Sequence, residues 1–176
     1  AGRTLLPARE SLESPCAPSV SGVSRKGEEP VKRANEYALS LKQPWATLLA
    51  CGLKTIEVRV WPTPRRGRIL IHASRTLDER PEAWKHVPAH LREQAHLLGG
   101  VVGVGELVSC IAYRRREHFV HDCPRHLNEP DWFRPPVLYG FAFTRLAPLP
   151  FVQVPGWMRF FEVELPSGAE SGISAD

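Results

Sequence analysis

Short runs of apolar and β-branched residues recur from residue 38 onward, and they limit what this chain can fold into. One of them, residues 55–61, alternates apolar and polar side chains, which gives a strand two different faces. These runs predict strands at residues 38–41, 55–61, 68–74, 101–113, 137–146 and 158–165. These strands are not regularly interleaved with helices, which argues against a doubly wound parallel sheet. We therefore expect an α+β fold, a small mixed β-barrel of five or six strands with peripheral helices.

Helix-type spacing is confined to two places. A short helix is predicted to open at Pro44 and to end at Gly52. Its apolar side chains stand three and four residues apart, at Trp45, Leu48 and Leu49. A second helical stretch is predicted within residues 77–98, and Pro88 is expected to split it into two helices. Residues 114–136 contain four prolines and are expected to be irregular.

Composition divides the chain into a domain and two flanking segments. Residues 1–36 are rich in Ser, Pro, Gly and Glu, so we predict a disordered or flexible N-terminal segment. Residues 37–166 are predicted to form the domain, and residues 167–176 a polar C-terminal tail. The domain has 17 basic and 12 acidic side chains, within a formal net charge of +4 for the whole chain. This excess suits an anionic partner such as nucleic acid, although arginine-rich composition also occurs without one.

Several protein classes are excluded by what the sequence lacks. No apolar run approaches the ~20 residues that a membrane span needs, and the first residues do not resemble a secretory signal. The four cysteines form no Cys-x-x-Cys pair and no dense framework. These features predict a cytoplasmic protein with reduced cysteines and no membrane partner.

The most informative residues follow the first helix. Lys54 stands just after the helix-ending Gly52, and Glu57 and Arg59 lie two residues apart on the next strand. Residues i and i+2 of a strand point to the same face, so the three charges are predicted to form an ionic cluster at the rim of the core. The alternative is a solvated strand face with an incidental ion pair, which contributes little to stability.

Other polar side chains stand near this cluster or within apolar strands. Gln43 and Trp45 lie at the start of the first helix, and His72 and Ser74 lie two residues apart at the end of a strand. Glu106 interrupts an otherwise apolar run. A carboxylate among valines and leucines is either paired, part of a functional site, or at a strand edge that faces water.

These residues together resemble the ASCH domain family, named for its homology to activating signal cointegrator 1. The family signature, Gly-x-Lys-x-x-Glu-x-Arg after a short helix, reads here as Gly52, Lys54, Glu57 and Arg59. A Gln-Pro-Trp precedes the helix, and a Trp-x-Thr-Pro-x-Arg-Gly turn follows the strand, at Trp61, Thr63, Pro64, Arg66 and Gly67. The resemblance is clearest over residues 38–74 and continues more weakly to about residue 165.

The resemblance implies a β-barrel similar to the PUA fold and a basic cleft built around the motif. Its expected ligand is single-stranded RNA, a nucleotide or a nucleoside, with no cofactor. Arginines would meet phosphates, and tryptophans would stack on unpaired bases. The residues expected to bind are Gln43, Trp45, Lys54, Glu57, Arg59, Arg66, His72, Ser74 and Glu106.

Two other functions stay open at this point. Some ASCH relatives resemble hydrolases of RNA or of a modified nucleoside, which makes Lys54 and Glu57 candidate catalytic residues, with His72 as an alternative base. The amidohydrolase branch has a threonine two residues before the motif arginine, where this chain has Glu57, so that mechanism lacks its nucleophile. The third reading is a non-catalytic domain that binds a protein partner through an apolar patch.

A group of histidines and the lysine within the motif are two smaller features of the sequence. His118, His121, Cys123 and His126 fall within nine residues, but their spacing matches no common zinc module, so no metal site is predicted. The chain has 18 arginines and five lysines, so a lysine within the motif suggests that a compact ammonium is needed there.

Overall fold

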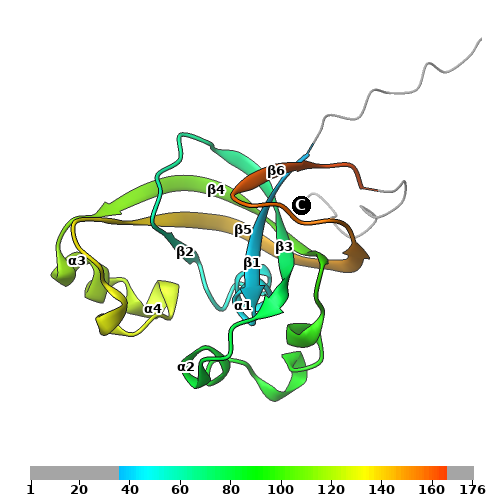
Figure 1. Ribbon diagram of the computed structural model, residues 1–176, viewed down its shortest axis with the longest axis horizontal. Helices are drawn as coiled ribbons and strands as arrows, with labels where there is room; N and C mark the ends of the chain where they lie inside the picture. The colour runs from blue at the N-terminus through cyan, green and yellow to red at the C-terminus, as the bar shows by residue number, and fades with distance from the viewer. Residues whose placement is uncertain (1–35, 166–176) are drawn as a thin grey trace, which may run out of the picture. The chain divides into compact units, whose positions relative to one another are not determined.

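The computed structural model describes residues 36–165. Apart from Glu36, the predicted N-terminal segment (1–36) and the predicted C-terminal tail (167–176) lie outside the described residues. The described chain forms one six-stranded sheet with short helices around it (Figure 1). The strands are β1 (Glu36–Gln43), β2 (Ile56–Arg59), β3 (Gly67–Leu77), β4 (Gly100–Tyr113), β5 (Leu138–Gln153) and β6 (Phe160–Val163). The predicted α+β class and strand count are confirmed.

The hydrogen-bonded order of the described strands is β2-β5-β4-β3-β1-β6. Only β1 and β3 pair in parallel, and every other neighbouring pair is antiparallel. The sheet is mixed but not closed by backbone hydrogen bonds, since β2 and β6 are its two ends. Side chains join those ends instead. Arg59, the last residue of β2, donates a hydrogen bond to the main-chain oxygen of Ser40 in β1, the strand next to β6. Trp61, which follows β2, packs against Phe160 in β6 with the two rings nearly perpendicular.

Helix α1 (Trp45–Ala50) is buried along its whole length against the sheet. It ends where predicted, because Gly52 adopts a positive φ of 73°, which side-chain-bearing residues rarely tolerate. The helix also comes unusually close to β4 at Gly103. A Cβ atom added to Gly103 would lie 2.4 Å from the Cβ of Ala50. The absence of a side chain at Gly103 therefore allows α1 to pack directly on the sheet.

Alternation along β1 and β3 directs side chains to two separate cores. Leu39 and Ile71 belong to the larger core, which contains α1, whereas Ala38 and Leu70 belong to a smaller core on the other face. This division decides which polar residues meet, because neighbouring positions of one strand face opposite sides.

The stretch within residues 77–98 is less helical than its spacing predicts. It contains only α2 (Pro81–Trp84) and two short 3-10 turns, η1 (Ala89–Leu91) and η2 (Gln94–His96). The predicted break at Pro88 is present, since η1 begins directly after it. Its apolar side chains still reach the core, at Ala83, Val87, Leu91 and Ala95.

The region predicted to be irregular contains three short helical elements, which corrects that expectation. They are α3 (Arg116–His121), α4 (Cys123–His126) and the 3-10 turn η3 (Pro130–Trp132). Two of its prolines occupy the first turn of a helical element, where the missing N–H costs nothing. Figure 1 shows α3 and α4 at the end of the sheet where β4 finishes. No helix within residues 36–165 is long and apolar enough to cross a membrane.

Candidate functional site

Lys54 lies at the centre of the motif and is only 1% exposed. Its Nζ donates a hydrogen bond of 2.8 Å to the main-chain oxygen of His126 and lies 3.3 Å from a carboxylate oxygen of Glu57. The same ammonium lies 4.9 Å from the centre of the Trp45 ring. Burial lowers the pKa of Lys54, and the Glu57 carboxylate opposes part of that shift. Protein groups therefore surround the ammonium on several sides.

Glu57 and Arg59 lie on the same face of β2, as their spacing predicts. The Nε of Arg59 lies 3.1 Å from Oε1 of Glu57, and the other carboxylate oxygen faces Lys54. Arg59 also donates its 2.8 Å hydrogen bond to the main-chain oxygen of Ser40. The three motif charges thus form one chain of ionic contacts, and its more exposed end is Arg59.

Trp45 connects the motif to the segment that follows β3. Its indole N–H donates a 2.7 Å hydrogen bond to Asp78, which also pairs with Arg80. Burial alone would raise the pKa of Asp78, but the hydrogen bonds from Arg80 and Trp45 outweigh it and hold the pKa at about 2. Trp45 is buried within this network.

Gln43 is fully buried, and its side-chain amide bonds to the main chain. Its N–H groups donate to the oxygens of Gln94 and Leu97, each at 3.1 Å. Its oxygen accepts a 3.0 Å hydrogen bond from the N–H of Thr47 in the first turn of α1. Gln43 therefore ties the start of α1 to the turn η2.

The segment carrying α3 and α4 is attached to the motif through the backbone. Besides the bond from Lys54 to His126, the N–H of Thr55 donates to the oxygen of Arg125 at 2.9 Å. The ring of His126 is buried against Phe119, and its Nε2 bonds to the oxygen of Phe119 at 2.9 Å. Burial lowers the pKa of His126 to about 4. Across the described chain, no group of three or more His, Cys, Asp or Glu side chains is placed to hold a metal ion.

His72 and Ser74 are not brought to the motif charges. His72 faces the smaller core, where its ring nitrogens contact Ser40 Oγ at 3.0 Å and the main-chain oxygen of Val154 at 3.2 Å. Gly156 covers this ring closely, since an added Cβ would lie 2.3 Å from it. Burial lowers the pKa of His72. Ser74 bonds locally to the main chain of Thr76.

Glu106 and Arg66 also have their own surroundings. Glu106 is partly exposed and pairs with Arg145 at 3.3 Å. Arg66 is exposed in the turn after β2, where it donates to the main-chain oxygens of Thr63 at 3.1 Å and Arg65 at 2.6 Å. The turn therefore holds the Arg66 guanidinium at the surface.

A pocket of about 360 Å³ lies along the end strand β2, and we call it the edge pocket. It is lined by Val58, Arg59, Val60, Trp61, Trp132, Arg134 and Leu138. Arg59 connects it to the buried motif charges. Trp132 and Arg134 come from the η3 region, more than 70 residues further along the chain, so spacing within the motif could not have identified them.

A second pocket, of about 520 Å³, also has Trp61 in its lining, and we call it the turn pocket. It is lined by residues 61–66 together with Arg159 and Phe160. The guanidinium of Arg65 lies 3.4 Å from the centre of the Tyr37 ring, and that of Arg159 lies 5.3 Å from Trp61. Neither pocket has an acidic side chain among its lining residues.

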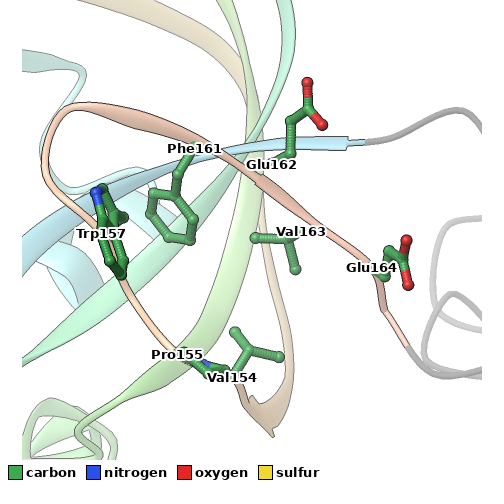
Figure 2. A pocket seen from close by; sticks show the side chains of 7 residues that line it. All are labelled: Val154, Pro155, Trp157, Phe161, Glu162, Val163 and Glu164. Carbon is green, nitrogen blue, oxygen red and sulfur yellow. The ribbon is translucent and has the colours of Figure 1, made fainter.

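A third pocket, of about 330 Å³, is mainly apolar. Figure 2 shows Trp157 and Phe161 together on its lining, while the carboxylates of Glu162 and Glu164 point away from them. Trp157 is 74% exposed and lines neither pocket beside Trp61. Trp157 therefore does not belong to the edge pocket or the turn pocket, which contain the arginines.

Comparisons with solved structures support the fold. Three structures of an ASCH protein from Zymomonas mobilis match, each at 16–17% sequence identity. A serine-to-alanine variant has a TM-score of 0.53 and the match covers 74% of this chain and 89% of that one. A tyrosine-to-phenylalanine variant has a TM-score of 0.51, with 74% and 91% covered.

Comparisons of sequence point to the same family. Activating signal cointegrator 1 from Homo sapiens is 28% identical over an alignment of 103 residues, and the match covers 53% of this chain and 18% of that protein. The protein of the same name from Mus musculus is 53% identical over 38 residues, 22% of this chain and 6% of that protein. The chain thus spans less than a fifth of these relatives' length. The family model of the ASCH domain matches residues 39–141, more than half of the chain, and the chain belongs to the ASCH domain family.

Proposed function

We propose that this domain binds RNA or a nucleotide in a basic cleft beside the motif, and that the edge pocket is where the ligand sits. The observation that carries the proposal is the lining of that pocket, which combines Arg59 and Arg134 with Trp61 and Trp132 and contains no carboxylate. Guanidinium groups suit phosphate, and indole rings suit unpaired bases. Membership of the ASCH family supports the same reading.

In this proposal the buried motif residues position the site and Arg59 meets the ligand. Lys54 is enclosed by Glu57, His126 and Trp45, so it holds the η3-bearing segment against β2. That segment contributes Trp132 and Arg134 to the pocket. The motif is therefore needed for binding even though its lysine is not at the surface.

The hydrolase alternative receives less support. It requires Lys54 or Glu57 to reach a scissile bond, as an electrophilic group or a base. Their present contacts are with each other, with Arg59 and with His126, and both side chains are buried. No contact of these residues favours turnover over binding.

The test is binding of a fluorescently labelled single-stranded RNA by the wild type and by two matched arginine variants. Arg134→Gln removes a charge from the edge pocket, and Arg92→Gln removes one from an exposed site outside both Trp61 pockets. We expect R134Q to weaken binding about five-fold or more and to reduce the slope of log K against log salt by about 0.7. We expect R92Q to bind like the wild type. Equal affinity of R134Q and R92Q, or no binding by the wild type at low salt, would contradict the proposal.

A further inference from the structure

We infer that the ligand is a single strand of at least two nucleotides that crosses Trp61, with one nucleotide in the edge pocket and the next in the turn pocket. The inference rests on the proposed function and specifies its ligand. Its basis is that two separate pockets share one lining residue, Trp61, and we call this residue the wall between them. Their volumes, about 360 and 520 Å³, each fall in the range of small-ligand sites, which is about 300–1,000 Å³.

Charge is present on both sides of this wall. The turn pocket is lined by Arg65, Arg66 and Arg159, and none of them forms an ion pair with a described carboxylate within residues 36–165. In the edge pocket Arg134 is likewise outside any such pair, whereas Arg59 shares its charge with Glu57. A single nucleotide in one pocket would leave the cations of the other unmatched. A strand with consecutive phosphates supplies an anion to each.

The wall itself is held in place. The Trp61 ring packs edge-on against Phe141, with centroids 4.9 Å apart, and against Phe160, with centroids 5.6 Å apart. These contacts come from β5 and β6, so the indole is fixed by the sheet and not by its own turn. A preordered ring costs little entropy when a ligand packs on it.

The arrangement selects an unpaired strand. Bases in a duplex are stacked on one another and paired, so they cannot enter two pockets separated by a protein ring. In a single strand the bases can be splayed apart, and aromatic side chains then take the place of the neighbouring bases. The guanidinium of Arg159 lies 5.3 Å from the centre of the Trp61 ring, so it places a cation next to a base that packs on Trp61.

The turn that forms the second pocket is also built rigidly. The main-chain N–H of Arg65 donates to Thr63 Oγ1 at 3.1 Å, and Thr63 is buried. Arg66 donates to two main-chain oxygens of the same turn. Its guanidinium is therefore oriented before any ligand arrives, as expected for a phosphate contact.

The test is a length series of oligouridylates of one, two, three and six nucleotides, with binding measured at low salt. The wild type is compared with Arg66→Gln/Arg159→Gln, which changes two arginines that line the turn pocket and not the edge pocket. It is also compared with Arg92→Gln/Arg114→Gln, which removes the same charge at exposed positions outside both pockets. We expect wild-type affinity to rise about ten-fold or more between one and three nucleotides. In R66Q/R159Q the mono- and trinucleotide should bind almost equally, whereas R92Q/R114Q should keep the gain.

The outcomes separate this inference from the proposed function. Equal wild-type affinity for the mono- and trinucleotide, or an undiminished length gain in R66Q/R159Q, would overturn the inference and leave nucleotide binding standing. Binding of a blunt RNA duplex as tightly as the single strand of the same length would also overturn it. If the wild type binds no member of the series, the proposed function itself fails.

Discussion

At the scale of single residues, the surroundings of Lys54 explain why a chain with far more arginine than lysine has a lysine in its motif. The slot between His126, Glu57 and Trp45 leaves Lys54 only 1% exposed, and a compact ammonium fits there. A guanidinium is wider, planar and carries five donors in a fixed geometry. The sequence indicated this preference from lysine scarcity, and the contacts now supply a physical reason.

The first prediction concerns this slot. Lys54→Met should lower the free energy of unfolding by about 3 kcal/mol, because it leaves the buried Glu57 with Arg59 as its remaining motif cation. Lys54→Arg should also destabilise, because the larger group must displace its neighbours. Urea unfolding measures both, with Lys42→Met and Lys42→Arg as controls at an exposed position. A K54R protein as stable as K42R would show that the slot does not select for lysine.

Glu57 and Arg59 lie on one face of β2, whereas His72 lies on another strand and away from them. The two-residue spacing on β2 was sufficient to predict the first pair, because both residues belong to one strand. His72 lies on β3, and its face could be assigned only once β1 and β3 were known to pair with Ser40 opposite it. Its role as a base near the motif stays a prediction without a supporting contact.

At the scale of elements, the placement of α1 on the sheet depends on the close approach at Gly103. The motif loop leaves α1 directly, since the N–H of Lys54 donates to the oxygen of Leu48 at 3.0 Å. A shift of α1 would therefore move Lys54 relative to β2. The position of one helix thus determines whether the motif charges meet.

This gives a prediction that a double-mutant cycle can check. Gly103→Ala should lower the free energy of unfolding by about 1–3 kcal/mol, because its Cβ would meet that of Ala50 at 2.4 Å. Ala50→Gly alone should cost about 1 kcal/mol through helix propensity. The double variant should lose less than the sum of the two, since removing the Ala50 methyl relieves the contact. Strict additivity would mean that this contact is not the cause.

Prolines account for the elements that the sequence reading placed wrongly. Pro124 and Pro130 lie in the first turn of helical elements, although their presence suggested an irregular region. Pro81 likewise opens α2, which stops after one turn. A proline is compatible both with a loop and with a first helical turn, and only the packing around it decides between them.

At the scale of the whole molecule, buried histidines couple stability to pH. The pKa of His126 is lowered from an ordinary 6.5 to about 4, and that of His72 is lowered as well, in both cases mainly by burial. In the unfolded chain these rings take up protons near pH 6.5, while in the folded protein they stay neutral to lower pH. Their contribution to stability is therefore fully present above pH 6.5 and is lost as the pH falls toward 4.

The corresponding experiment compares unfolding free energies at pH 7 and about pH 4.5. The wild type should lose stability over this interval, and His126→Gln should remove about 2 kcal/mol of that loss, because its side chain does not titrate. His90→Gln, at an exposed histidine, should leave the loss unchanged. An H126Q variant with the full wild-type pH dependence would refute the assignment.

The sequence by itself determined the α+β class, the helix that ends at Gly52, and the shared face of Glu57 and Arg59. Each of these follows from residues within one element, where periodicity and backbone preference act locally. Only the tertiary structure decided which residues line the edge pocket and the turn pocket beside the motif. Trp132, Arg134 and Arg159 reach Trp61 through strand pairing and through the segment anchored by Lys54, and contacts between such distant residues leave no periodic signal in the chain.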